Sequence, residues 1–492
     1  MSSYSWLVIA AQDDYDQLVS MLDLDFAPTE VATTLKAAIS AGVKGILVES
    51  GYVDKDYRST FYNFYAKKGR AYRSDCVRLH FFDEFVAYDD VKAALDCTDD
   101  RPEDHYFGYI VLRPTLVATI GRSILSPDIR NGAHGMVIQS EHQVHLLGYK
   151  LRVWGFPSMA QHTDIAVCAH VSCWAILRHY SEKFPQHREL LIHDITKLAQ
   201  QFDPGGITPS LGLNVLHAER VFQAAGSFPL VVKRQVHTDP NLQRENDNHF
   251  MGQLLAYMES GFPLFIELAK KGHAIVSVGH SWNKAPAAVP LPSSLSAGQL
   301  GTLVAVDDNH LPYTCVDSVL ATGYCFSDIS GFIVPLPDKI YYPADAVEKQ
   351  SHALYASLST VMPMPAQTEL IRRYFVTTLS ALRRDARKNE SQLGDILVGA
   401  IMRLRTSQFI WVVEYASADQ WNLEHVSARA ILDATASPYD PTPMWFVHDE
   451  SNAIFFDRDT ATPAANVVKL MRSPNTPLGR MEQNLRPVVP RK

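Results

Sequence analysis

The sequence has few cysteines and no long hydrophobic run. Only six cysteines occur among 492 residues, which is too sparse for a secreted domain held together by disulfides. No segment approaches the roughly 20 consecutive apolar residues that span a bilayer. The N-terminal stretch MSSYSWLVIAAQDDYDQL lacks the basic region and the apolar length of a signal peptide. We therefore expect a cytoplasmic protein with reduced thiols and no membrane association.

The chain also lacks a net positive charge and a glycine-rich phosphate loop. Its formal net charge is −8 at pH 7, whereas proteins devoted to nucleic acids depend on excess lysine and arginine. Neither the P-loop pattern nor the dinucleotide-binding pattern of glycines occurs. Residues 57–72 are rich in Tyr, Phe, Lys and Arg and could stack nucleic-acid bases, but a helix with an aromatic core face explains them better. We expect no cofactor and no strong interaction with nucleic acid.

What is present predicts three units in an α+β protein. The length corresponds to about three domains. We expect residues 1–150 to form an N-terminal α/β domain of unknown role, residues 151–343 a central domain, and residues 344–492 a C-terminal α/β domain with a frayed tail. The alternation of apolar and polar residues over 135–155 predicts a strand pair. In the C-terminal unit, the pattern over 367–405 predicts helix.

The chemistry of the chain centres on residues 161–180, QHTDIAVCAHVSCWAILRHY. A polar lead-in ends at Cys168, and a strongly apolar run follows, which predicts a buried helix that begins near this cysteine. Unpaired backbone N–H groups and the helix dipole at that position favour an anion, and the thiolate is the reactive form of cysteine. Cys173 lies about 500° further around the same helix, so both thiols cannot line one site. We expect Cys173, beside Trp174 in the apolar run, to be a core residue.

A histidine and a carboxylate further along the chain could complete a catalytic site. His273 opens a predicted strand in which His273, Ile275 and Ser277 share one face. If this strand pairs antiparallel with TLVAV, the end of the second strand lies beside the start of the first. That end carries Asp307 and Asp308, and a carboxylate at His273 Nδ1 would fix the tautomer and stabilise the imidazolium. Plain alternatives are an exposed strand-edge histidine and an Asp-rich turn.

Other side chains near Cys168 allow further interpretations. Gln161 could donate its amide to an oxyanion hole together with the Cys168 backbone N–H, or it could be an ordinary loop residue. A zinc site is a weaker alternative, because the spacing of the candidate ligands matches no usual arrangement. Those ligands are His162, Asp164, Cys168, His170 and Cys173. We expect no metal.

These residues, in this order, resemble the papain-like cysteine peptidase superfamily over roughly residues 155–340. The nearer similarity is to bacterial peptidases of the double-glycine-leader, bacteriocin-processing type. In that family a glutamine precedes a Cys-Gly-Pro-Ala motif at a helix start, a histidine opens a strand, and an aspartate ends the next strand. Here Gln161, Cys168, His273 and Asp307 or Asp308 occupy those places. The motif itself departs from the family, because Cys-Ala-His-Val replaces Cys-Gly-Pro-Ala.

The resemblance implies a thiol hydrolase that acts on a peptide or isopeptide bond of a protein or peptide substrate. Cys168 would attack, His273 would take and return the proton, Asp307 or Asp308 would orient His273, and Gln161 would help to bind the oxyanion. The flanking domains would choose the substrate, gate access or contact a partner protein. Two alternatives use the same scaffold: an acyltransferase or transglutaminase-like enzyme with the same triad, and a catalytically inactive papain-like interaction module.

Overall fold

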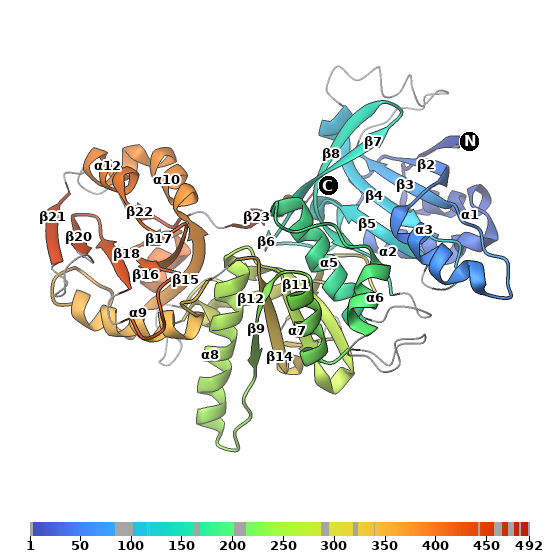
Figure 1. Ribbon diagram of the computed structural model, residues 1–492. Coiled ribbons are helices and arrows are strands. Elements are labelled where there is room, and N and C mark those ends of the chain that lie inside the picture. The colour runs from blue at the N-terminus through green and yellow to red at the C-terminus, as the bar shows by residue number, and fades with distance from the viewer. Residues whose placement is uncertain are drawn as a thin grey trace.

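The protein is an assembly of helices and antiparallel sheets, seen here in a computed structural model. It describes residues 3–83, 102–115, 117, 119–161, 168–200, 213–286, 295–317, 323–338, 340–440, 443–456, 465–470, 477–481 and 484–490. All pairings between its named strands are antiparallel. The three large sheets follow one another across the molecule, with the sheet of the middle residues between the other two (Figure 1). Within the described segments, no helix combines the length and the apolar character needed to cross a membrane.

The first sheet contains seven strands within the described residues and has a hydrophobic core on each face. Its strand order is β1 (Ser3–Val8), β2 (Gly45–Tyr52), β3 (Cys76–Phe82), β4 (Tyr106–Leu112), β5 (Ile120–Leu125), β8 (Tyr149–Ser158) and β7 (Ser140–Leu146). The α-helices among the described residues of this unit are α1 (Leu18–Met21), α2 (Pro28–Ala38) and α3 (Lys55–Asn63). β7 and β8 confirm the predicted strand pair, and the expected boundary at residue 150 falls inside β8.

The predicted aromatic core face in residues 57–72 is confirmed. Tyr57, on α3, and Tyr65 are 2% and 3% exposed and belong to the core on one face of the first sheet. Phe61 and Phe64 pack against the same core. These rings therefore pack in the protein core and do not form an exposed surface for stacking bases.

The second sheet carries the segments that matter for the candidate site. Its main path is β13 (Thr314–Val316), β12 (Leu300–Val306), β11 (His273–Trp282), β10 (Leu264–Leu268), β14 (Gly331–Leu336) and β9 (Phe228–Lys233). Its helices are α5 (Cys168–Lys183), α6 (Ile192–Gln200), α7 (Val215–Ala224) and α8 (Pro240–Glu259). Asp239 caps the start of α8 by accepting from the N–H groups of Asn241 and Leu242. Gly261, at a φ of 78°, turns the chain from α8 into β10.

The last strand of the chain returns to the middle of the protein. β23 (Arg486–Pro487) pairs with β6 (Met136–Val137), and β6 in turn pairs with β11. Asn484 Nδ2 donates to the backbone oxygens of Glu259 and Val376, each at 3.0 Å. The C-terminal segment thus contacts β6 from the first unit, the end of α8 from the second unit and β15 from the third unit.

The third sheet corrects one expectation. Its order is β15 (Ile371–Thr378), β16 (Phe409–Ala416), β18 (Ala428–Asp433), β19 (Met444–His448), β20 (Asn452–Phe456) and β21 (Ala465–Lys469), and β17 (His425–Val426) pairs separately with β22 (Leu478–Gly479). Its helices are α9 (Ala344–Leu358), α10 (Leu379–Lys388), α11 (Glu390–Leu393), α12 (Asp395–Arg403) and α13 (Ala418–Asn422). The prediction of continuous helix over 367–405 was wrong, because the aromatic and β-branched run of β15 pairs along its length with β16.

The third sheet shares a core with the second. Alternate residues of β16 point to opposite faces, and Trp411, Val413 and Tyr415 join the main hydrophobic core that also contains α5 and β11. Ile410 and Val412 face a separate core under α10 and α12. The second and third sheets are therefore joined by continuous hydrophobic packing.

A buried ionic cluster reinforces this joint. Arg373 on β15 is 1% exposed. Its Nε donates to Glu259 at the end of α8 at 2.6 Å, and its Nη1 donates to Glu414 on β16 at 2.7 Å. Arg429 Nη2 donates to Glu414 at 2.8 Å. Burial alone would raise the pKa of Glu259, but the charge of Arg373 and the remaining contacts lower it to about 2.

Replacing Glu414 should destabilise this joint strongly. In Glu414→Gln two buried guanidinium groups lose a charged partner, which costs about 3–5 kcal/mol when a buried ion pair is broken. Urea unfolding followed by tryptophan fluorescence measures the change. Glu424→Gln is the control, because Glu424 is 78% exposed and its ion pair with Arg480 contributes less than about 1 kcal/mol. Equal midpoints for the two variants would contradict a structural role for the cluster.

Candidate active site

Cys168 is the first residue of α5, as predicted. It is half-buried, and it forms no disulfide. The first amides of a helix have no partner within the helix, and they lie at the positive end of its dipole, so a helix start of this kind favours a bound anion. Cys173 is fully buried, and burial raises the pKa of its thiol. The predicted core role of Cys173 is confirmed.

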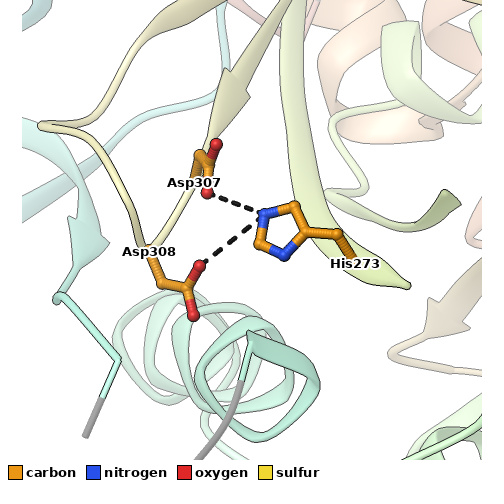
Figure 2. A group of neighbouring side chains, drawn as sticks. All are labelled: His273, Asp307 and Asp308. Carbon is orange, nitrogen blue, oxygen red and sulfur yellow. Dashed lines mark hydrogen bonds and ion pairs between the residues drawn. The ribbon is translucent and has the colours of Figure 1, made fainter. Parts of the chain in front are cut away.

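The pairing of β11 with β12 brings His273 to Asp307. His273 opens β11, and Asp307 follows the last residue of β12. Val276 lies opposite Val306 in the antiparallel register, which confirms the predicted pairing. His273 Nε2 lies 2.9 Å from Asp307 Oδ1. In Figure 2, the dashed lines from Asp307 and Asp308 meet at the same ring nitrogen.

The orientation of the imidazole differs from the expected one. We expected a carboxylate at Nδ1, but both carboxylates face Nε2. This rotamer leaves Nδ1 of His273 unengaged by either carboxylate, and the ring also interacts with Cys168. Burial lowers the pKa of His273, but the hydrogen bond to Asp307 and the interaction with Cys168 outweigh burial and raise it to about 10. The ring is therefore an imidazolium at neutral pH.

The pKa values of the two aspartates are shifted in opposite directions. Asp307 Oδ1 accepts from His273 and also from the backbone N–H of Asn309 at 3.0 Å. Burial raises the pKa of Asp307, but these partners outweigh burial and lower it. Asp308 Oδ1 lies further from His273 Nε2, at 3.7 Å. Burial, together with the charge of Asp307, raises the pKa of Asp308 to about 7 against the opposing effect of His273. Asp307 is thus the ionised partner of His273.

Gln161 reaches the same site through a residue that the sequence did not single out. Its Nε2 donates to Asn309 Oδ1 at 3.3 Å, and its backbone N–H donates to the Asp308 carbonyl at 3.3 Å. Asn309 Nδ2 lies 3.4 Å from Asp307 Oδ1 and 3.4 Å from His273 Nε2. Asn309 therefore links Gln161 to Asp307, the partner of the imidazole. The sequence pointed to Asp307 and Asp308 as partners of His273, but for Asn309 it indicated only a turn.

Tyr324 was also missed from sequence. Its ring stacks on the His273 ring with centroids 5.7 Å apart and an interplanar angle of 22°. Burial and the neighbouring Asp307 raise the pKa of Tyr324 to about 12, so the phenol is neutral. The ring covers one face of the imidazole and fixes its plane.

His273, Asp307 and Asp308 could also be a cation site. Ligand atoms from all three lie within 4.8 Å of one another, and among the residues that the structure describes this is the one such group of three or more. A metal needs a deprotonated imidazole nitrogen. Because the pKa of His273 is raised to about 10, a proton competes strongly for Nε2. The donor set therefore suits a hydrogen-bonded His–Asp pair better than a metal.

The zinc ligands considered from sequence do not form a group within the described residues. His162 and Asp164 lie outside those residues. His170 and Cys173 are 1% and 0% exposed within α5. Among the members of this set that the structure describes, Cys168 interacts with His273.

Known proteins give no independent assignment of this site. No family model matches the sequence, and no curated protein or solved structure matches it. The papain-like resemblance therefore stays a prediction, and the geometry of the described side chains carries the functional argument.

Proposed function

We propose that this protein is a papain-like cysteine hydrolase that cleaves a peptide or isopeptide bond. The observation that carries the proposal is the position of His273, which is hydrogen-bonded to Asp307 and interacts with a thiol at the start of a helix. An imidazolium stabilises a neighbouring thiolate, and a carboxylate holds the imidazolium in place. The three groups come from α5, β11 and the end of β12, so a rigid scaffold positions them.

The reaction follows from this arrangement. The Cys168 thiolate attacks the scissile carbonyl, and a new C–S bond forms as the C–N bond breaks. His273 gives its proton to the leaving amine. Water then attacks the thioester, its proton passes to His273, and the carboxylic acid leaves as the thiolate is restored. Gln161, whose side-chain amide lies against Asn309, is the proposed donor to the oxyanion, with the Cys168 backbone N–H as the second donor.

A papain-like arrangement accounts for the order of elements. In that arrangement, a helix that begins with the cysteine packs against an antiparallel sheet that carries the histidine and the acid. The packing of α5 on β11, with Ser172 Oγ donating to the Ala274 carbonyl at 3.3 Å, supports it. Cys-Ala-His-Val differs from the Cys-Gly-Pro-Ala motif of that family at residues that include buried ones, since His170 is 1% exposed.

Two other functions are compatible with the same scaffold. An acyltransferase would pass the acyl group from Cys168 to an amine in place of water. An inactive interaction module would have a Cys168 thiol no more reactive than an ordinary one. Product analysis with an added amine distinguishes the first function, and thiol reactivity distinguishes the second.

Cys168 should be the thiol that iodoacetamide modifies at pH 6. Only the thiolate alkylates at a useful rate, and the imidazolium of His273 stabilises it. We expect Cys168 to react at least about tenfold faster than Cys315, which is also half-buried and whose pKa burial raises. Mass spectrometry of the digested protein measures both rates.

His273→Ala provides the control for this experiment, because it should remove the selectivity of Cys168 while the buried cores remain intact. Far-UV circular dichroism checks the fold of the variant. Equal rates for Cys168 and Cys315 in the unmodified protein would favour the inactive module.

The two aspartates should affect the pH profile differently. The proposed ion pair between the Cys168 thiolate and the His273 imidazolium is lost as the pH rises through the raised pKa of His273, about 10. Asp307→Asn removes an opposite charge, which lowers such a pKa by about 1–3 units, so the alkaline limb should move to lower pH. Asp308→Asn should move it less, because Asp308 lies further from Nε2. Nitrophenolate release from p-nitrophenyl acetate measures the profile, with Cys168→Ala as background, and the reverse ranking would make Asp308 the orienting residue.

Removal of metal ions should leave the activity unchanged. We expect dialysis against EDTA to alter neither the alkylation of Cys168 nor the release of nitrophenolate, because the proposed chemistry needs only protein groups. Loss of ester cleavage on dialysis, with recovery on addition of Zn²⁺, would mean that His273, Asp307 and Asp308 hold a metal.

A further inference from the structure

A cavity of about 210 Å³ lies beside the candidate site, between the first sheet's unit and the loop that follows β12. A water molecule occupies about 30 Å³. The cavity is several times larger than that, so one long side chain can enter it. Its wall combines apolar side chains with a few polar groups. The lining residues are Glu30, Val31, Thr34, Thr119, Ile120, Ser158, Met159, Ala160, Asp308, Asn309, His310 and Leu311.

Two buried side chains in the cavity wall, Asp308 and Thr119, have no hydrogen-bond partner within the described residues, although Asp308 Oδ1 faces His273 Nε2 at 3.7 Å. Asp308 is 5% exposed, and neither of its carboxylate oxygens accepts a hydrogen bond within the described residues. Thr119 is 6% exposed, and its hydroxyl is likewise unpartnered. Buried polar groups are costly when they are unpaired, and a ligand that donates hydrogen bonds would satisfy them. Glu30, at the exposed start of α2, adds a negative charge with no cation paired to it in the described part of the chain.

The location of the cavity relates it to one half of the substrate. In the proposed reaction, His273 gives its proton to the leaving amine, so the amine side of the substrate lies on the imidazole side of the thiol. Asp308 lies 3.7 Å from His273 Nε2, and Asn309 contacts the same nitrogen. Both residues line the cavity. The amine-side part of the substrate is therefore the part that can enter it.

We propose that this cavity selects a lysine or arginine side chain on the amine side of the scissile bond. The acidic and unpartnered groups favour a cation that donates several hydrogen bonds. Val31, Met159 and Leu311 offer apolar surface to the methylene groups, as long basic side chains require. An anionic side chain would face the charge of Glu30 and would oppose the ionisation of Asp308, whereas a cation would favour both carboxylates. This inference rests on the proposed thiol hydrolase and gives the first unit of the chain a role in selecting substrate.

The test compares two amines that capture the same acyl group. p-Nitrophenyl acetate acylates Cys168, and either water or an added amino-acid amide then takes the acetyl group. The amine nitrogen attacks the thioester, its proton passes to His273, and the Cys168 thiolate leaves. Argininamide and leucinamide differ in side chain but present a similar α-amine. We expect argininamide to capture the acetyl group at a concentration at least about fivefold lower than leucinamide, as chromatography of the acetylated products measures.

Variants identify the cavity as the source of this preference. Glu30→Gln should reduce the preference for argininamide about three- to fivefold, the effect of one exposed ion pair, and Glu30→Lys should reverse it. Glu369→Gln, an exposed glutamate on the third unit, should change nothing. If the acyl-enzyme forms and both amides capture it equally, the cavity does not select a basic side chain, although the hydrolase stands. If nitrophenolate release does not require Cys168 and His273, the proposed function itself fails.

Discussion

The antiparallel pairing of β11 with β12 is the constraint on which the candidate site depends. Val276 opposite Val306 fixes the register, and it places the first residue of one strand beside the residue that follows the other. A slip of one residue would move His273 to the opposite face of the sheet, because side chains alternate along a strand. The buried side chains of both strands resist such a slip, since Val276, Val304 and Val306 all belong to the main core. α5 is fixed to the same strand, so one element of the sheet positions both the imidazole and the helix that begins with Cys168.

Asp307 and Asp308 are adjacent, but their surroundings shift their pKa values in opposite directions. Two buried carboxyl groups in contact do not both ionise at neutral pH without compensating charge. The imidazolium and the Asn309 backbone N–H supply that compensation to Asp307, and Asp308 is left with the higher pKa, about 7. This asymmetry lets Asp307 hold His273 in its charged form, while the Asp308 carboxyl group faces a cavity that could bring it a donor. The same pair of adjacent residues can thus serve the imidazole on one side and a ligand on the other.

The sequence predicted those parts of the site that short segments encode. Cys168 at a polar-to-apolar junction and His273 at a strand start are local patterns, and the structure has both. Asn309 and Tyr324 escaped prediction because they approach the imidazole through tertiary packing, from loops with no periodic pattern. β15 escaped for a related reason. Its arginines resembled the polar face of a helix, but Arg373 is neutralised by glutamates 114 and 41 residues away in sequence. A short stretch of sequence around β15 does not contain those partners, so its local pattern could not show that Arg373 is buried and paired.

The flanking units also help to build the candidate site. The first unit supplies α2 and the end of β8 to one wall of the cavity. The third unit shares its hydrophobic core with α5 and β11, and its cluster around Arg373 holds the end of α8, which leads through Gly261 into β10. β10 pairs with β11, with Leu268 opposite His273. The buried Glu259 is therefore connected to β11, the strand that carries His273, through the end of α8 and β10. A fragment of residues 155–340 alone would lack Glu30 and the α2 wall of the cavity and would expose the core that it shares with the third unit, so we do not expect this segment to fold by itself.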